Sequence, residues 1–414
     1  MSRVVVSRPL PRHVQVSAVR TLAAVHPDDW NRRDLTSDLG RVVDAALAEE
    51  LARHVLRNHP RPPRPRLALA TAVGAFRVEV ALESEAPGRL VGRTLADIGD
   101  VARLLDSTVP ELEWFADLGG WLRTKPPPLR HYKVERIPKR GGVRLLEIPK
   151  PRLREAQRRV LRHVLDPAEP HSAATGFRRG GSVHGFAQPH TGAAIVLRVD
   201  LRQCFATVTY PRVRGVFSSL GYPRGVAKIL AGLCTTATSP TDLRGLDAWS
   251  AAVLRARHLP QGAPTSPSLA NLAMRRLDAR VAGLARARGL EYTRYGDDLA
   301  LSGQMDSGLV AAVVARIVAS EGFEVNPAKT RVMHRHGQQE LAGVVVNERA
   351  QAPRAEYDTL RALLHNAARF GAESQNRSGV PDFRAYVYGR IAWVGQGNSV
   401  RRERLLYLAD RVRW

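Results

Sequence analysis

Apolar residues recur every three or four positions along much of the chain, which is the spacing of amphipathic helices. The spacing is clearest over residues 33–58, where Asp34 or Thr36 could cap the first turn. The Arg-Pro-Pro-Arg-Pro-Arg run at 61–66 cannot continue a helix, so it predicts a linker or a sharp turn. Further helices are predicted over 94–115, 151–165, 211–235, 267–287 and 355–414.

Shorter apolar runs bounded by turn residues predict strands. Residues 131–149 form two such runs joined by Lys139-Arg140-Gly141-Gly142. A compact apolar run over 194–199 leads directly to Asp200. A hairpin fits residues 290–303, with Tyr295-Gly296-Asp297-Asp298 at its tip, because glycine tolerates the backbone angles of a tight turn. The pattern therefore predicts acidic residues at the end of one strand and at the tip of a hairpin.

Composition narrows the class of protein. A chain of 414 residues can form two or three domains, each with its own core. Because 44% of the residues are hydrophobic and no apolar run is long enough to span a bilayer, we expect a soluble protein with no membrane partner. Residues 1–12 lack the apolar segment of a secretory signal, and two cysteines, Cys204 and Cys234, are too few for a disulfide framework. These features predict a cytoplasmic protein.

The charge balance gives the first indication of function. The chain has 63 Lys and Arg against 39 Asp and Glu, a formal net charge of +24. An excess of this size favours a polyanionic partner, most simply nucleic acid. The alternative is an ordinary solvated basic surface, which accounts for individual arginines but not for the size of the net charge.

Asp200, Asp297 and Asp298 form a pattern that suits templated nucleotide transfer. In that reaction a primer hydroxyl attacks the α-phosphate of a nucleotide, and two Mg²⁺ ions stabilise charge on the attacking and leaving oxygens. Mg²⁺ prefers oxygen ligands and keeps some waters, so a few carboxylates on rigid elements suffice. Adjacent acids on a hairpin tip are, however, more often solvated turn residues. We assign Asp28-Asp29 to that ordinary class because no apolar strand flanks the pair.

The sequence around these acids decides between the two interpretations. In chain order the informative blocks are Val199-Asp200-Leu201-Arg202-Gln203-Cys204-Phe205, Leu259-Pro260-Gln261-Gly262-Ala263-Pro264-Thr265-Ser266-Pro267, Tyr295-Gly296-Asp297-Asp298, Gly322-Phe323-Glu324-Val325-Asn326-Pro327-Ala328-Lys329-Thr330 and Leu341-Ala342-Gly343-Val344-Val345-Val346-Asn347. These blocks and their order resemble motifs A to D and the following block of the reverse transcriptase family, particularly its bacterial retron and group II intron branch. The resemblance covers residues 95–414.

The resemblance implies an RNA-directed DNA polymerase with an α+β fold, the right-hand polymerase fold of fingers, palm and helical thumb. Fingers and palm would occupy residues 94–346 and the thumb residues 347–414. Residues 1–93 would form a mainly helical N-terminal extension that binds RNA or a partner.

The resemblance also implies roles for the acidic residues and their neighbours. Asp200, Asp297 and the backbone carbonyl of Leu201 would hold two Mg²⁺ ions, for which Mn²⁺ can substitute, and Asp298 would support them. Lys329 matches a lysine thought to protonate the leaving pyrophosphate. The alternative for Lys329 is an ordinary surface lysine in a loop.

A second set of residues would contact the incoming nucleotide. Phe205 matches the steric gate, a flat ring beneath the sugar that leaves no room for a 2′-hydroxyl; alternatively the ring simply packs inward. Lys139 and Arg144 match residues that grip the triphosphate, although each could be an ordinary solvated charge. Gln261 and Gly262 match residues that line the nucleotide and its template partner.

The branch of the family is a further prediction. The stretch from Asn347 to Trp414 leaves room only for a thumb, which favours a retron-type enzyme over a group II intron protein. Three departures keep another bacterial reverse transcriptase, with a different template, open. Retron enzymes usually have Ala where Gly296 stands and Val-Thr-Gly where Leu341-Ala342-Gly343 stands, and their Asn-Ala-x-x-His signature is not found between motifs A and B. A third hypothesis, an inactive RNA-binding scaffold, is disfavoured because all three aspartates are present.

A retron-type enzyme predicts a definite set of partners. They are deoxynucleoside triphosphates, an RNA template, the RNA–DNA hybrid and a cognate non-coding RNA that the enzyme copies in part. For the family, the DNA product usually serves antiphage defence, often with a separate effector protein.

Overall fold

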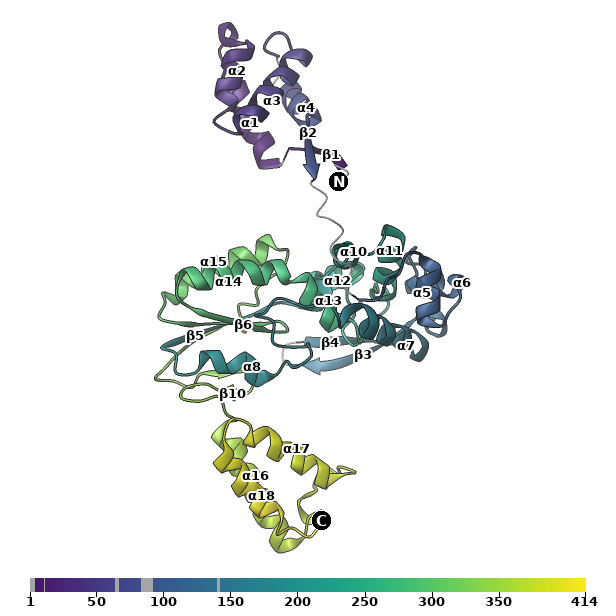
Figure 1. Cartoon of the computed structure of the whole chain (residues 1–414), viewed down its shortest axis with the longest axis vertical. Helices are drawn as coiled ribbons and strands as arrows, with labels where there is room; N and C mark the ends of the chain where they lie inside the picture. The colour runs from purple at the N-terminus through teal and green to yellow at the C-terminus, as the bar shows by residue number, and fades with distance from the viewer. Residues whose placement is uncertain (1–3, 11, 64–66, 83–91, 140–141) are drawn as a thin grey trace. The chain divides into compact units, whose positions relative to one another are not determined.

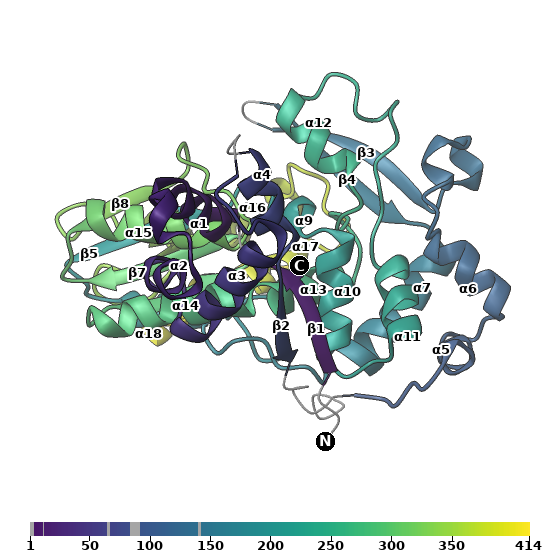
Figure 2. The same cartoon turned by 90° about the horizontal axis from the view of Figure 1, so that it is seen from above.

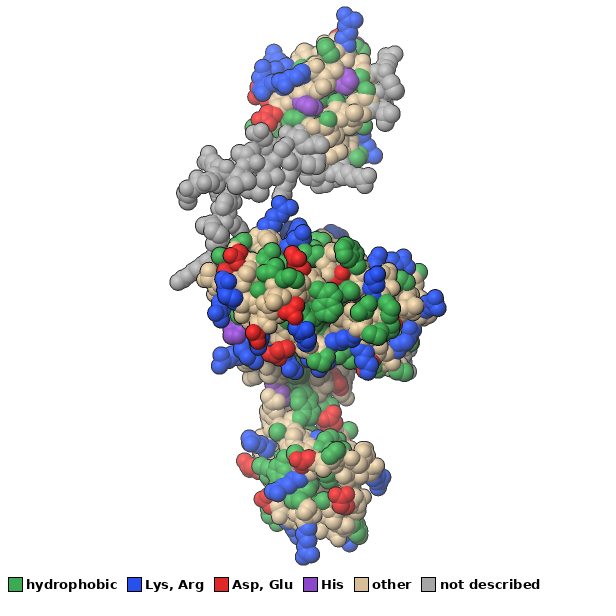
Figure 3. All heavy atoms as spheres, turned by 90° about the vertical axis from the view of Figure 1, so that its right-hand side faces the viewer, with side chains coloured by type: hydrophobic (Ala, Val, Ile, Leu, Met, Phe, Trp, Pro, Cys, Tyr) green, Lys and Arg blue, Asp and Glu red, His purple; other side chains and the backbone are tan. Residues whose placement is uncertain are grey.

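The structure is a computed structural model that describes residues 4–10, 12–63, 67–82, 92–139 and 142–414. The chain divides into two compact units, Met1–Gly88 and Arg89–Trp414. The predicted linker at 61–66 lies partly outside the described residues. Within the described ranges, no helix combines the length and the apolar character needed to cross a membrane. Figure 3 shows Lys and Arg side chains spread over the visible surface with Asp and Glu between them.

The first unit is a small helical domain closed by one pair of strands. Strand β1 (Val4–Pro9) pairs antiparallel with β2 (Arg77–Leu82). The helices between them are α1 (Arg12–Ala24), α2 (Arg32–Leu39), α3 (Ala45–Asn58) and α4 (Leu67–Ala75). Their apolar faces meet in one core that includes Leu22, Leu35, Leu51 and Val73. The Asp28-Asp29 pair lies in a short exposed 3-10 turn, η1 (Pro27–Asp29), as expected of ordinary turn residues.

The prediction of one helix over 33–58 is wrong. Helix α2 starts at Arg32, where the Asn31 side chain accepts a hydrogen bond from the Asp34 amide, so neither Asp34 nor Thr36 is the cap. It ends before Gly40, a residue that disfavours helix continuation. The Asp44 side chain then caps a new helix by accepting from the Leu47 amide. Two local capping signals therefore override a continuous apolar stripe.

The second unit is built around a four-stranded antiparallel sheet of order β6-β7-β5-β8. Its strands are β5 (Ile195–Asp200), β6 (Glu291–Tyr295), β7 (Asp298–Gly303) and β8 (Arg331–His334). The predicted strand before Asp200 and the predicted hairpin are thus confirmed. A separate hairpin of β3 (Tyr132–Lys139) and β4 (Gly142–Pro149) lies to one side of this sheet (Figures 1 and 2).

Alternating side chains on β5 and β7 bury both faces of the sheet. Leu197, Val199 and Leu301 enter the largest core, which is covered by α14 (Arg275–Ala287) and α15 (Ser307–Ser320). Val196 and Ala300 point to the opposite face, where α8 (Val183–Ala187) and the short pair β9 (Glu340–Leu341) and β10 (Val344–Val345) pack. Figure 1 shows these two layers on either side of the sheet. Strand β5 is therefore rigidly held where it ends on Asp200.

Further helices complete the unit. The helical segments predicted over 94–115, 151–165 and 355–414 are confirmed, whereas the single helices predicted over 211–235 and 267–287 each divide into two. The further helices are α5 (Ile98–Leu105), α6 (Val109–Ala116), α7 (Pro151–Val160, continued by a π-helical turn, η4, Leu161–Leu165), α9 (Cys204–Thr207), α10 (Tyr210–Ser219), α11 (Arg224–Leu233), α12 (Ala248–Arg255) and α13 (Ser266–Ala273). The last 60 or so residues hold α16 (Arg354–Phe370), α17 (Phe383–Gly395) and α18 (Ser399–Ala409), which share a core of their own.

Candidate active site

Strand pairing brings the three predicted aspartates together. In the β5–β7 register Asp200 lies directly opposite Asp298, and the Leu201 amide donates to the Asp297 carbonyl at 2.9 Å. Asp200 is only 3% exposed although it is an acid at a strand end. Asp200 and Asp298, which are 98 positions apart in sequence, are therefore neighbours because two apolar strands pair antiparallel.

The hairpin tip requires a glycine at position 296. Gly296 has φ +63°, a conformation that side chains with a Cβ adopt at a cost. A Cβ at this position would also lie 2.9 Å from the Phe177 ring. These two constraints explain physically why this turn carries Gly at position 296.

Under the tip lies a buried arginine that sequence reasoning missed. The Arg294 side chain is fully buried, and its Nε and Nη2 each donate to the Asp278 carboxylate at 2.7 Å. Its Nη1 donates to Asn271 Oδ1 at 2.9 Å and to the Gly296 carbonyl at 3.0 Å. The Tyr292 hydroxyl donates a further hydrogen bond to the Asp278 carboxylate, at 2.8 Å. An arginine within the predicted hairpin strand was a local signal of this network, but it does not identify Asp278 on α14 as the partner.

The carboxylates differ in their partners. Arg198 binds Asp298 through two hydrogen bonds of 2.9 Å. Lys329 Nζ lies 3.0 Å from Asp200 Oδ1, and Asn326 donates to Asp200 Oδ2 at 3.2 Å. Burial raises the pKa of Asp297, and repulsion from the Asp298 and Asp200 carboxylates adds to the effect. The structure thus brings Lys329 to the predicted site, where it pairs with Asp200.

The arrangement suits a cation that is shared with a substrate. Within the described ranges, no three Asp, Glu, His or Cys side chains are arranged to hold a metal ion between them. Arg198 binds both oxygens of Asp298 and Lys329 pairs with Asp200, so a cation held by Asp200 and Asp297 would displace the Lys329 ammonium from Asp200. Mg²⁺ is commonly held by one or two carboxylates plus substrate phosphates. Its positive charge would offset the burial and the like-charge repulsion that raise the pKa of Asp297. This donor set therefore fits a divalent ion.

A cavity of about 320 Å³ brings together three of the predicted nucleotide contacts. Phe205, Gln261 and Gly262 line it, with Arg154 and Arg158 from α7. The 260–264 segment docks on β4 because the Glu147 amide donates to the Gln261 carbonyl at 2.9 Å. Gly262 has φ +134°, and a Cβ there would lie 3.0 Å from the Glu147 carbonyl. Arg154 and Arg158 were not among the nucleotide contacts predicted from the sequence.

Lys139 and Arg144 are not part of this cavity as described. Arg144 is exposed on β4 opposite Ile137. The Lys139 backbone pairs with Gly142 at the end of the hairpin, and its side chain lies outside the described residues. Their predicted roles therefore remain predictions.

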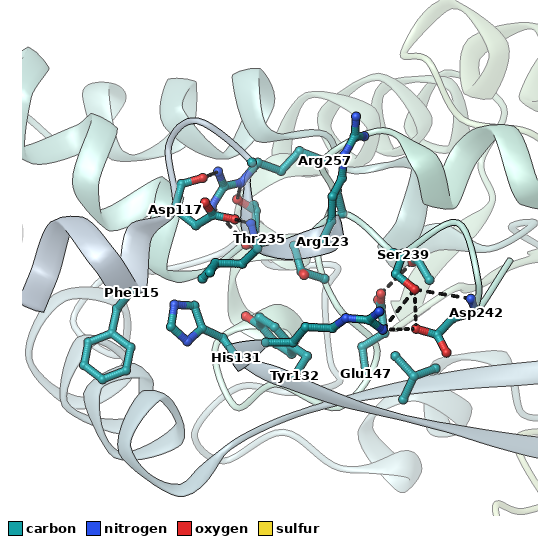
Figure 4. Close-up of a pocket in the computed structure, with 17 residues that line it drawn as sticks. Phe115, Asp117, Arg123, His131, Tyr132, Glu147, Thr235, Ser239, Asp242 and Arg257 are labelled. Atoms are coloured by element: carbon teal, nitrogen blue, oxygen red, sulfur yellow. Dashed lines mark hydrogen bonds and ion pairs between the residues drawn. The ribbon is translucent and has the colours of Figure 1, made fainter. Parts of the chain in front are cut away.

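A second cavity, of about 50 Å³, lies beside β3, and His131, Tyr132 and Glu147 are among the residues that line it (Figure 4). Its half-buried Arg257 donates to the backbone carbonyls of Asp117 and Gly232, at 2.5 and 2.8 Å. Its buried Glu147 accepts from Thr238 at 2.7 Å and pairs with His258 at 2.8 Å. Because His258 directly precedes the 259–267 segment, this polar network fixes the segment that carries Gln261.

Comparison with known proteins adds independent findings. Residues 137–362 match the family described as Reverse transcriptase (RNA-dependent DNA polymerase). The Retron Mx65 reverse transcriptase of Myxococcus xanthus is 40% identical over 341 residues, covering 77% of this chain and 76% of that protein. The Retron Ec86 reverse transcriptase of Escherichia coli is 34% identical over 282 residues, covering 67% and 79% respectively. A solved telomerase from Candida albicans in complex with a telomeric RNA fragment covers 67% of this chain and 55% of its own at 13% identity; its TM-score of 0.38 supports no argument.

Proposed function

The chain belongs to the reverse transcriptase family and is an RNA-directed DNA polymerase of retron type, and we propose that Asp200 and Asp297 carry out its chemistry with two Mg²⁺ ions. The observation that supports this most is the β5–β7 register, in which Asp200 lies opposite Asp298 and the Leu201 amide is 2.9 Å from the Asp297 carbonyl. In this proposal the two carboxylates and the Leu201 carbonyl hold the ions at the end of strand β5.

Each residue of the site has a proposed task. When bound, the two ions supply positive charge to the attacking and leaving oxygens. Asp200, Asp297 and the Leu201 carbonyl hold them, and Arg198 keeps the Asp298 carboxylate in position beside them. Lys329 is the proposed proton donor to the leaving pyrophosphate, since its ammonium already lies at Asp200.

The cavity lined by Phe205 is the proposed site of the deoxynucleoside triphosphate. Gln261 and Gly262 border the base and sugar, and Phe205 blocks a 2′-hydroxyl. Arg154 and Arg158 add positive charge to the same cavity, where it would neutralise phosphates. Lys139 and Arg144 would join them from the β3–β4 hairpin once a nucleotide is bound.

Replacing Phe205 tests this assignment. We expect Phe205→Ala to incorporate ribonucleotides because the space for a 2′-hydroxyl opens, and the preference for deoxynucleotides should fall at least about tenfold. Primer extension with each deoxynucleotide and its ribonucleotide competitor measures the preference. Phe370→Ala, which removes an exposed ring from α16, is the matched control and should keep it. Unchanged discrimination in Phe205→Ala would reject the gate.

We further propose that residues 94–346 act as fingers and palm and residues 347–414 as the thumb. The helices α16 to α18 have their own core and carry exposed arginines such as Arg369 and Arg384, which suits contact with the backbone of an RNA–DNA hybrid. The Met1–Gly88 unit also has its own core, which suits a separate RNA- or partner-binding module for residues 1–93.

The proposed biological template is a cognate non-coding RNA, copied in part for antiphage defence with a separate effector protein. Support comes from the two retron reverse transcriptases that the chain resembles over most of its length. The test is to express the chain with its flanking chromosomal DNA and to look for co-purifying RNA and for RNA-linked DNA. The product should vanish in the Asp297→Ala, Asp298→Ala double variant. An active enzyme without either nucleic acid would reject the retron template.

A further inference from the structure

Phe177 has a backbone conformation that is unusual for a bulky residue. Its φ is +56°, and the other non-glycine residues with positive φ in the described part of the chain are Asp106, Asp117, Gln203 and Ala342, none of them aromatic. An aromatic side chain in the left-handed region is a true outlier, and such strain persists only where the surroundings hold it. The strain calls for a physical cause nearby.

The segment before Phe177 is held from both sides. The Thr175 amide donates to the Arg294 carbonyl at 2.8 Å, and the Arg294 amide donates to the Ala173 carbonyl at 2.7 Å. Asn271 donates to the Gly176 carbonyl at 2.8 Å. Gly176 has no room for a side chain, since a Cβ there would lie 2.9 Å from the Tyr295 ring. Phe177 is therefore attached to the strand that carries the catalytic turn.

The ring of Phe177 lies against that turn and remains open to solvent. Its centroid is 5.4 Å from that of Tyr295, and it is the group that a Cβ on Gly296 would meet at 2.9 Å. Asp297 is the next residue along the chain. Even so, the side chain is 48% exposed, so core packing does not account for the strain. The two residues that follow, Arg178 and Arg179, are exposed cations.

An exposed ring followed by cations is the combination that binds a nucleotide of a single strand, through base stacking and phosphate contacts. The strand that must end here is the one with the attacking hydroxyl, because reaction requires this group about 3–3.5 Å from the α-phosphate. The incoming nucleotide is already assigned to the cavity lined by Phe205. We propose that Phe177 stacks against the terminal nucleotide of the priming strand and so positions its hydroxyl beside Asp297.

This inference rests on the proposed function of Asp200 and Asp297, and its test separates the two. Three variants divide the possible roles of the side chain. Phe177→Gly removes the ring and the backbone strain together, Phe177→Leu keeps apolar bulk without a flat ring, and Phe177→Tyr keeps the ring. Leu309→Ala, which truncates another exposed apolar side chain on α15, is the control.

Two measurements are made on each full-length variant. The first is primer extension on an RNA template, with separate KM values for primer–template and for deoxynucleotide. The second is the fluorescence of a primer that ends in 2-aminopurine, which is quenched by stacking and requires no catalysis. Thermal unfolding is followed in parallel.

Phe177→Gly should unfold at or above the wild-type temperature because glycine relieves the strain. Its KM for primer–template should rise about tenfold, as expected for a lost stacking contact, while its KM for deoxynucleotide changes less than about twofold. The 2-aminopurine quench should weaken in Phe177→Gly and Phe177→Leu and persist in Phe177→Tyr and the control. An unaltered quench and unaltered primer KM in Phe177→Gly would overturn the inference. A wild type that quenches the primer but never extends it would instead reject the proposed function.

Discussion

Two arginine–aspartate pairs lie along the same sheet, and they differ in how completely other groups surround them. Arg294 and Asp278 are both fully buried, and each charge is also bound by neighbouring polar groups. Arg198 and Asp298 have the same two-bond geometry but side chains that are 30% and 14% exposed. The first pair lies beneath the turn that carries Gly296 and Asp297, and the second lies at its edge.

The difference shows how one kind of ion pair can serve two purposes. A buried pair is costly to form, and it is tolerated when geometry and further hydrogen bonds are complete, as they are around Arg294. It then fixes structure, here the Gly296 carbonyl that precedes Asp297. At the edge, water weakens the attraction, so Arg198 contributes mainly by orienting Asp298 and by setting the local charge.

The largest effect on stability is expected at the buried pair. Arg294→Met should reduce the free energy of unfolding by about 3–5 kcal/mol because Asp278 is left buried without a counter-charge. Urea unfolding measures this loss, and Arg286→Met, at an exposed position of α14, is the control. Adding Asp278→Leu to Arg294→Met should recover much of the loss. A single variant as stable as wild type would remove the distinction between the pairs.

A smaller effect is expected at the edge pair. Arg198→Ala should reduce the free energy of unfolding by no more than about 1 kcal/mol, since the pair is partly solvated. Loss of this positive charge should lower the Mg²⁺ concentration needed for half-maximal primer extension. The control is Arg331→Ala, at the β8 position that pairs with Arg198 of β5. A large loss of stability in Arg198→Ala would mean that both pairs are structural.

The smallest effect is expected in the pH dependence. The pKa of Asp297 is raised above the ordinary 3.8 by burial and by Asp298 and Asp200. Its ionised form is therefore disfavoured in the folded state, a cost that is absent at low pH and grows as pH rises through the folded-state pKa. Activity should fall as pH drops through the same value. Asp298→Asn removes one like charge and so lowers the pKa of Asp297. The residual activity of this variant should therefore fall at a lower pH than the activity of the wild type. A shift to higher pH would contradict this assignment.

The carboxylate site was predictable from the sequence because its signals are local. An apolar run ending on Asp200 and a glycine beside two acids specify a strand end and a hairpin tip, and pairing of the strands does the rest. The buried network under the tip was not predictable. Arg294 and Asp278 are on different elements, and nothing in their immediate neighbours indicates that they meet without water.

The N-terminal unit shows where sequence patterns mislead. The apolar stripe over 33–58 predicts one helix, but the caps at Asn31 and Asp44 divide it into two. The pairing of β1 with β2 was missed because the two strands are separated by four helices, so their register depends on the fold of everything between them. The spacing of apolar residues therefore reveals neither where a helix is capped nor which distant strands pair.

The most direct test of the central claim, that the aspartates at this sheet edge carry out DNA synthesis, is primer extension on an RNA template with Mg²⁺ and all four deoxynucleotides. The account predicts that the wild type extends the primer. The Asp297→Ala, Asp298→Ala double variant should extend the primer at least about a thousandfold more slowly than the wild type. It should unfold at a similar temperature. Extension by the double variant at the wild-type rate would contradict the account.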